Sequence, residues 1–82
     1  MTQIPYINAA ATGLNIDRLR SRKGLSVKDM QEEFGFTTPQ AIYKWIHGTA
    51  LPSVKNLVIL SKMLGVSMDD IIILEAYTKK FT

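Results

Sequence analysis

Four of the five glycines divide the middle of the 82-residue sequence into short segments, and a residue that favours a helix start follows each of them. Glycine is preferred just beyond the end of a helix, whereas Ser and Thr side chains accept hydrogen bonds from the free amides at its start. The predicted ends are Gly24, Gly35, Gly48 and Gly65, and the predicted starts are Ser26, Thr38 before Pro39, Ser53 and Ser67. This punctuation allows only short helices.

Apolar residues recur at helical spacing in every segment, and no alternating strand pattern of useful length is present. The expected helices begin at Asn15, Ser26, Thr38, Ser53 and Ser67, with apolar positions at Ile16, Leu19, Val27, Met30, Phe34, Ile42, Trp45, Leu57, Leu60, Met63, Leu64, Ile71 and Ile72. We therefore predict an all-α, compact five-helix domain over residues 14–74. Residues 1–13, which contain Pro5, are expected to form a flexible arm, and residues 75–82 a helical extension or tail.

Several classes of function lack their residues in this sequence. The chain has no cysteine for a disulfide or thiolate metal site and a single histidine, His47, so neither a zinc site nor a His-based triad is expected. We expect no enzyme activity and no cofactor. The start has no signal-peptide pattern, and the longest apolar run near the C-terminus, 71–74, is far shorter than the ~20 residues that span a bilayer. A soluble, cytoplasmic protein is the expectation.

Positive charge is concentrated in the first three-quarters of the chain. Residues 15–64 contain eight basic side chains (Arg18, Arg20, Arg22, Lys23, Lys28, Lys44, Lys55, Lys62) against four acidic ones (Asp17, Asp29, Glu32, Glu33). This distribution favours a polyanionic partner, although solvated helix faces would give the same pattern.

The segment T-T-P-Q-A-I-Y-K-W-I-H-G, residues 37–48, presents polar side chains on a short helix that follows another short helix and a G-F-T-T turn. A helix-turn-helix places its second helix in the DNA major groove. Ile42 and Trp45, three residues apart, would hold this helix to the body. Gln can then pair with adenine, Lys can donate to guanine or phosphate, and Ala can contact a thymine methyl.

Residues 15–72 resemble the Cro/cI-type (XRE, lambda-repressor-like) helix-turn-helix family. The resemblance rests on I-D-R-L-R-S-R-K-G-L-S-V-K-D-M, on T-P-Q-A-I-Y-K-W-I-H-G and, most specifically, on L-P-S-V-K-N-L-V-I-L-S-K-M-L-G-V-S-M-D-D-I-I. It implies a DNA-binding domain of bacterial or phage type, usually a transcriptional repressor that binds an inverted-repeat operator as a homodimer.

The resemblance also implies contacts to double-stranded DNA, with the recognition helix at about 38–46. The base-contacting residues would be Thr38, Gln40, Ala41 and Lys44, and the backbone-contacting residues Ser26, Lys28, Tyr43, His47, Thr49, Lys55 and Arg22. The chain departs from the family pattern in having Val27 in place of a common Gln and Gln31 in place of a small residue. The turn also appears one residue longer than is usual, which would shift the base contacts by one.

The end of the predicted fifth helix carries an apolar stripe that a small core does not need. Ile73, Leu74, Tyr77 and Phe81 are the predicted dimer contact. Alternatively, this stripe folds back on the arm at Ile4, Tyr6 and Ile7. A further alternative function is a helical protein-interaction module, or an antitoxin-type protein, that docks a partner protein through this apolar surface. The salt dependence of binding separates DNA binding from docking of a partner protein, because phosphate contacts weaken steeply with salt.

Overall fold

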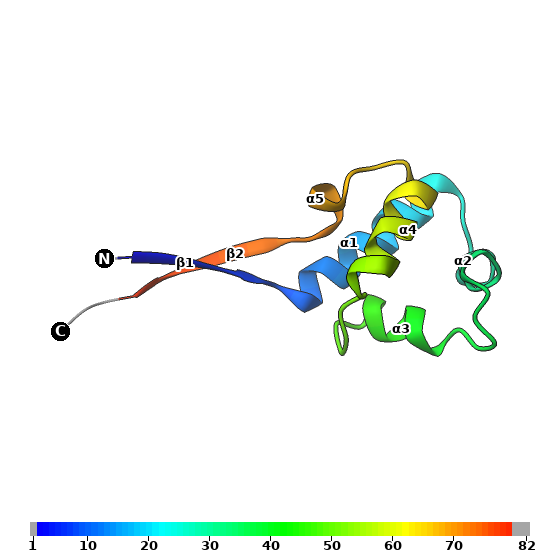
Figure 1. Cartoon of the computed structure of the whole chain (residues 1–82), viewed down its shortest axis with the longest axis horizontal. Helices are drawn as coiled ribbons and strands as arrows, with labels where there is room; N and C mark the ends of the chain where they lie inside the picture. The colour runs from blue at the N-terminus through cyan, green and yellow to red at the C-terminus, as the bar shows by residue number, and fades with distance from the viewer. Residues whose placement is uncertain (1, 80–82) are drawn as a thin grey trace.

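The computed structural model describes the backbone of residues 2–79 and the side chains of residues 5–75. The described part contains five helices and two strands: β1 (Thr2–Ile7), α1 (Ala9–Lys23), α2 (Val27–Phe34), α3 (Gln40–Ile46), α4 (Val54–Leu64), α5 (Met68–Ile71) and β2 (Leu74–Lys79). The helices form one body, and β1 and β2 form a ribbon that projects from it (Figure 1). The molecule is therefore elongated, with extents of 51 × 22 × 20 Å.

The core lies between the helices and is built from the apolar positions that the helical spacing predicted. Its buried members are Ile16, Leu19, Met30, Ile42, Trp45, Leu57, Leu60, Leu64 and Ile71. Burying a side chain of this size contributes about 1.5–3 kcal/mol, so the body depends on each helix keeping its apolar face inward. The predicted helical fold class is confirmed.

Most of the predicted helix boundaries are also confirmed. Ser26 and Ser67 cap α2 and α5 through capping boxes with Asp29 and Asp70, and Ser53 caps α4. The residues that follow α1, α2 and α4 are the predicted glycines. These signals are local, so they act in the same way whatever the rest of the chain does.

The prediction that Asn15 starts the first helix is wrong. α1 begins at Ala9, and its cap is Asn8, whose side chain accepts a hydrogen bond from the Ala11 amide at 2.9 Å. Asn15 lies inside α1, buried, where its amide group donates to the carbonyls of Asp70 (2.7 Å) and Ile71 (2.9 Å) at the end of α5. The Asn15 side chain thus satisfies two backbone carbonyls that have no partner within the short helix α5.

Gly13 explains why the helix runs through a segment that reads as a loose arm. A Cβ atom at this position would lie 2.2 Å from the Trp45 carbonyl oxygen and 2.5 Å from that of Ile46. Glycine therefore lets α1 cross the end of α3 at close range, and this packing offsets its low helix propensity.

The start of α3 differs by a small amount from the prediction. Thr38 makes no capping hydrogen bond, and the helix begins at Gln40 after Pro39, whose carbonyl accepts from the Tyr43 amide at 3.1 Å. Pro39, with φ −84° and ψ 4°, ends the turn, so the free amides of the first turn lack a side-chain cap.

The two ends of the chain differ most from the sequence analysis. β1 and β2 pair antiparallel in a register that sets Ile4 opposite Tyr77 and Ile7 opposite Leu74. The flexible arm is therefore wrong for residues 2–13, and the helical extension is wrong for residues 75–79. The backbone pairing agrees with the alternative stated above, in which the apolar stripe at the end of the chain folds back on the arm at its beginning. The division of the chain at residues 14 and 74 stays a prediction.

The fifth helix is shorter than predicted because α1 holds the chain that leaves it. Ile72 is already extended, with ψ 125°. The buried hydroxyl of Thr12 accepts from the Ile73 amide, and the Asn8 amide donates to the Ile73 carbonyl, both at 2.9 Å. These bonds take the backbone of Ile73 out of the helix and direct it into β2.

Candidate nucleic-acid interface

α3 has one buried and one exposed side, as the sequence predicted. Ile42 and Trp45 are buried, whereas Gln40, Tyr43 and Lys44 are exposed. The other two predicted base contacts are Thr38 and Ala41. Thr38 is exposed in the preceding turn, and Ala41 is half-buried against the core. In Figure 1 α3 lies along one edge of the body, so that its outer side faces away from the other helices.

Three aromatic rings fix α3 relative to α2. The rings of Phe34 and Phe36 stack with centroids 5.0 Å apart, and both meet Trp45 edge-on, at 5.3 Å and 6.0 Å. Phe36 belongs to the turn itself, and its carbonyl accepts from the Gln31 side chain at 3.2 Å. The turn that carries the angle between the two helices is therefore packed and hydrogen-bonded.

The C-terminal end of α3 is closed by the loop that follows it. The amide and the hydroxyl of Thr49 both donate to the Lys44 carbonyl, at 2.9 Å and 3.2 Å. The rings of Tyr43 and His47 stack one helical turn apart, with centroids at 6.0 Å. Tyr43, His47 and Thr49 thus form an exposed polar surface next to Lys44.

The start of α2 offers amides rather than a side chain. The Ser26 hydroxyl accepts from the Asp29 amide, and the Asp29 carboxylate accepts from the Ser26 amide, both at 2.9 Å. The hydrogen bonds from the Ser26 backbone and side chain lower the pKa of Asp29. Within the described residues, the first-turn amides that remain without a chain partner are those of Val27 and Lys28. Free amides at a helix start are suited to a phosphate oxygen.

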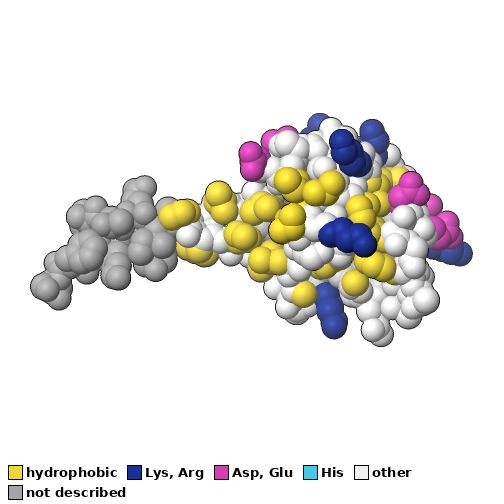
Figure 2. All heavy atoms as spheres, viewed as in Figure 1, with side chains coloured by type: hydrophobic (Ala, Val, Ile, Leu, Met, Phe, Trp, Pro, Cys, Tyr) yellow, Lys and Arg dark blue, Asp and Glu magenta, His cyan; other side chains and the backbone are white. Residues whose placement is uncertain are grey.

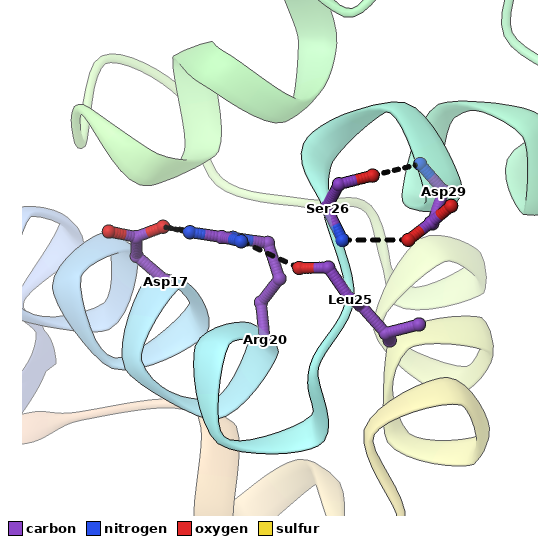
Figure 3. A network of polar contacts seen from close by, with 5 residues as sticks. All are labelled: Asp17, Arg20, Leu25, Ser26 and Asp29. Atoms are coloured by element: carbon purple, nitrogen blue, oxygen red, sulfur yellow. Dashed lines mark hydrogen bonds and ion pairs between the residues drawn. The ribbon is translucent and has the colours of Figure 1, made fainter.

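Arg20, which no sequence motif singled out, holds the start of α2 in place. Its guanidinium donates to the Leu25 carbonyl at 2.6 Å and to the Asp17 carboxylate at 2.7 and 3.0 Å (Figure 3). Because Leu25 directly precedes the cap Ser26, the guanidinium joins the body of α1 to the first turn of α2. The i, i+3 spacing of Asp17 and Arg20 is the sequence signal that would have pointed to this pair.

The predicted backbone contacts on other elements are not all close together. Lys55, exposed, lies in the first turn of α4, shortly after the loop that closes α3. Arg22, also exposed, lines a hollow of about 240 Å³ with Leu64 and Gly65, at the other end of α4. α4 has 11 residues and is about 16 Å long, and the two cations lie toward its opposite ends.

A comparison with protein-family models matches residues 16–71 to a helix-turn-helix family of XRE type. The chain belongs to the XRE-type helix-turn-helix family. Among solved structures, the chain is similar to one described as the crystal structure of the DNA-binding domain of BldD, with a TM-score of 0.67 and 20% sequence identity. The alignment covers 79% of this chain and 93% of that one, which supports the same fold. No curated protein shows a significant sequence match.

Membership of the XRE-type family makes the chain a DNA-binding transcription regulator, and α2, the turn and α3 are its helix-turn-helix. Within the described residues no group of three or more His, Cys, Asp or Glu side chains is placed to hold a metal ion. No helix among those residues has the length and apolar character needed to cross a membrane.

The described part of the predicted dimer contact lies at the base of the ribbon and in β2, and not on a helix. Ile73 is half-buried at the base of β2 and Leu74 is exposed. Tyr77 belongs to β2, but its side chain lies outside the described side chains, and Phe81 lies outside the described residues. The four-residue spacing of the stripe therefore has no helical meaning over Leu74–Lys79.

Proposed function

We propose that this XRE-type protein is a sequence-specific repressor that binds an inverted-repeat operator in double-stranded DNA as a homodimer, in a cytoplasm. The observation that carries this proposal is the two-sidedness of α3, where Ile42 and Trp45 are buried while Gln40 and Lys44 are exposed. A groove about 12 Å wide accepts one helix, and its base edges are read by long hydrogen-bonding side chains on the exposed side of that helix.

In this proposal Gln40 and Lys44 read base edges from successive turns of α3. Gln can bond both to N6 and to N7 of adenine, and Lys can donate to O6 or N7 of guanine. Ala41 lies between them, half-buried, so only its methyl group is offered to the groove. Thr38, exposed at the end of the turn, is the fourth proposed base contact.

The proposed phosphate contacts flank α3 on both sides. On one side are the amides of Val27 and Lys28 at the start of α2, together with the Lys28 side chain. On the other are Tyr43, His47 and Thr49, with Lys55 beyond them. Ser26 supports this contact by capping α2, because its own amide and hydroxyl are bonded to Asp29. Arg22, in the last turn of α1 and beside the C-terminal end of α4, is the weakest member of the proposed set.

The test is a measurement of sequence preference in the variants Gln40→Ala and Lys44→Ala. Each should reduce discrimination between the selected operator and a scrambled duplex by about 1–3 kcal/mol, because a base contact is lost. Lys62→Ala, which removes an exposed cation from α4, is the charge-matched control and should retain the preference. Full preference in both α3 variants would contradict this assignment of the recognition helix.

An exposed apolar surface favours the protein-interaction module as a second candidate. Ile7 and Leu74, paired at the base of the ribbon, are 44% and 60% exposed. A docking module that uses this surface would bind its partner protein with little salt dependence, and Gln40→Ala and Lys44→Ala would leave that binding unchanged.

A further inference from the structure

The β1–β2 ribbon projects from the helical body, and within residues 2–79 no further helix or strand covers it (Figure 1). A two-stranded ribbon is at best marginally stable by itself in water, and further strands or a packed helix are needed to support it. Figure 2 shows apolar side chains continuing from the body onto the described base of the ribbon. Ile7 and Leu74, which pair at this base, are exposed, so the base is only partly covered in a single chain.

One hydrogen bond at the base of the ribbon shows which facing residue pairs of β1 and β2 are hydrogen-bonded and which are not. The Asn8 amide donates to the Ile73 carbonyl at 2.9 Å, which marks this pair as hydrogen-bonded. Hydrogen-bonded and non-hydrogen-bonded pairs alternate along an antiparallel ladder. In the observed register Pro5 lies opposite Ala76, three pairs from the base, so it occupies a non-hydrogen-bonded pair. The backbone nitrogens of Pro5 and Ala76 therefore face the two outer edges of the ribbon.

The two outer edges consequently differ. Proline has no N–H, so the outer edge of β1 lacks a donor near its centre, a common way in which proteins block an edge strand. The outer edge of β2 presents the N–H and C=O groups of Leu74, Ala76 and Thr78, and β2 contains no proline. Only the β2 edge has the full set of groups that another strand needs.

We propose that the outer edge of β2 pairs antiparallel with the same edge of a second copy of this chain, forming a four-stranded sheet in the order β1-β2-β2-β1. This deepens the proposed function, because an inverted repeat requires a two-fold dimer. The β2 edge is self-complementary about a two-fold axis, as such a dimer demands. When the pairing is centred on Tyr77, position 75 of each copy lies opposite position 79 of the other, so the sequence sets an acidic residue, Glu75, facing a basic one, Lys79.

Glu75 is already held in place for this arrangement within one chain. Its carboxylate accepts a hydrogen bond from the Tyr6 hydroxyl and another, at 2.8 Å, from the Asn8 side chain. The negative charge is thus fixed at the base of β2. A second copy would add two paired strands to a ribbon that, within residues 2–79, pairs with no third strand.

The first experiment is sedimentation equilibrium of the full chain without DNA, with Ala76→Pro and its matched control Ala76→Thr. Proline at 76 removes an N–H from the outer edge and leaves the ladder to β1 intact, because that N–H does not point to β1. We expect the unchanged chain and Ala76→Thr to dimerise, and Ala76→Pro to associate at least about tenfold more weakly, since each copy loses a hydrogen bond. Equal association of Ala76→Pro, or a wild-type monomer at every concentration, would overturn the proposal.

Disulfide formation provides a test that does not depend on how well Ala76→Pro folds. The chain has no cysteine, so a single introduced thiol can link only to its own copy in a second chain. Facing residues of a non-hydrogen-bonded pair lie about 4.5 Å apart at Cα, within the range of a disulfide. Tyr77→Cys should form linked dimers on oxidation, and Gln3→Cys, on the blocked strand, should not. Linking through Gln3→Cys alone would contradict pairing at β2.

DNA binding is measured separately, on a single half-site and on an inverted repeat. Ala76→Pro should keep half-site affinity and lose the additional affinity for the repeat. A chain that dimerises through Ala76 but binds no DNA supports the ribbon pairing and contradicts the proposed function. A monomer that binds DNA contradicts the ribbon pairing and the proposed homodimer, and supports only DNA recognition by a single copy.

Discussion

At the scale of single residues, two buried residues of α1, one without a side chain and one polar, decide how this helix packs against the rest of the body. Gly13 permits the crossing with α3, and Asn15 bonds to the carbonyls of Asp70 and Ile71 at the end of α5. Neither role has a local sequence signature. In the sequence, Gly13 and Asn15 suggest the end of a loop and the start of a helix. The residues that they contact in the fold are 30 or more positions away, so the sequence around them gives no sign of those contacts.

Gly13→Ala should destabilise the fold by about 3 kcal/mol, at the upper end of the usual cost of overpacking, because the new methyl group would overlap backbone carbonyls that cannot rotate away. Urea unfolding measures the effect. Leu14→Ala, at the next position, is the control and should change stability little, since Leu14 is exposed. An unchanged midpoint for Gly13→Ala would mean that α1 and α3 do not cross at this distance.

Asn15→Ala should cost about 1–3 kcal/mol because it leaves two carbonyls at the end of α5 without their donor. The loss should be accompanied by faster hydrogen exchange of amides in α5 and at Ile73, measured by NMR. Equal exchange rates in the variant and the wild type would show that Asn15 does not hold this end of the molecule.

At the scale of elements, the capping box of α2 links the proposed phosphate site to pH. The pKa of Asp29 is lowered in the folded protein by its bonds to Ser26. A carboxyl group with a lowered folded-state pKa contributes stability above its unfolded pKa, near 3.9, and the contribution is lost as the pH falls through the folded value. The cap should therefore be intact at neutral pH and weaken in acid.

Asp29→Ala should destabilise the protein at pH 7. The difference in stability between the variant and the wild type should diminish below about pH 4, as protonation of Asp29 weakens the cap of the wild type. Denaturant unfolding at several pH values measures this difference. Glu33→Gln, an exposed change on the same helix that leaves the cap in place, should leave stability at pH 7 nearly unchanged. A difference for Asp29→Ala that stays constant down to pH 2 would contradict the role of the cap.

The elements also show how far sequence reasoning extends. The capping boxes at Ser26 and Ser67, the glycine ends and the buried pair Ile42 and Trp45 were predictable because each depends on residues within one helix. The strands were not, because β1 pairs with residues about 70 positions later in the chain, and neither segment has a strand pattern of useful length alone. The exposed side of α3 was predictable from the same helical spacing, whereas Arg20 acts through a contact with Leu25 that spacing does not reveal.

At the scale of the whole molecule, the proposed contacts combine a few base-reading side chains with a larger set of phosphate contacts. Basic residues outnumber acidic ones in residues 15–64. In the proposed interface, the free amides of α2 and the exposed residues after α3 both supply phosphate contacts. Affinity should thus come mainly from phosphates, and sequence preference from α3.

If roughly six phosphates are contacted, affinity should fall about a thousandfold between 50 and 200 mM salt. Fluorescence anisotropy with a labelled duplex measures the slope of log affinity against log salt concentration. Lys28→Ala should reduce that slope by about one contact and leave sequence preference unchanged. A flat salt dependence would instead agree with an apolar docking surface.

The central claim is sequence-specific recognition of DNA by α3 in a two-fold dimer, and selection of bound duplexes from a randomised DNA pool tests it most directly. We expect enrichment of an inverted repeat whose half-sites lie about one helical turn, ~34 Å, apart, and loss of that enrichment in Gln40→Ala. No enriched sequence at low salt would contradict specific recognition, and a single enriched half-site without a repeat would contradict the dimer.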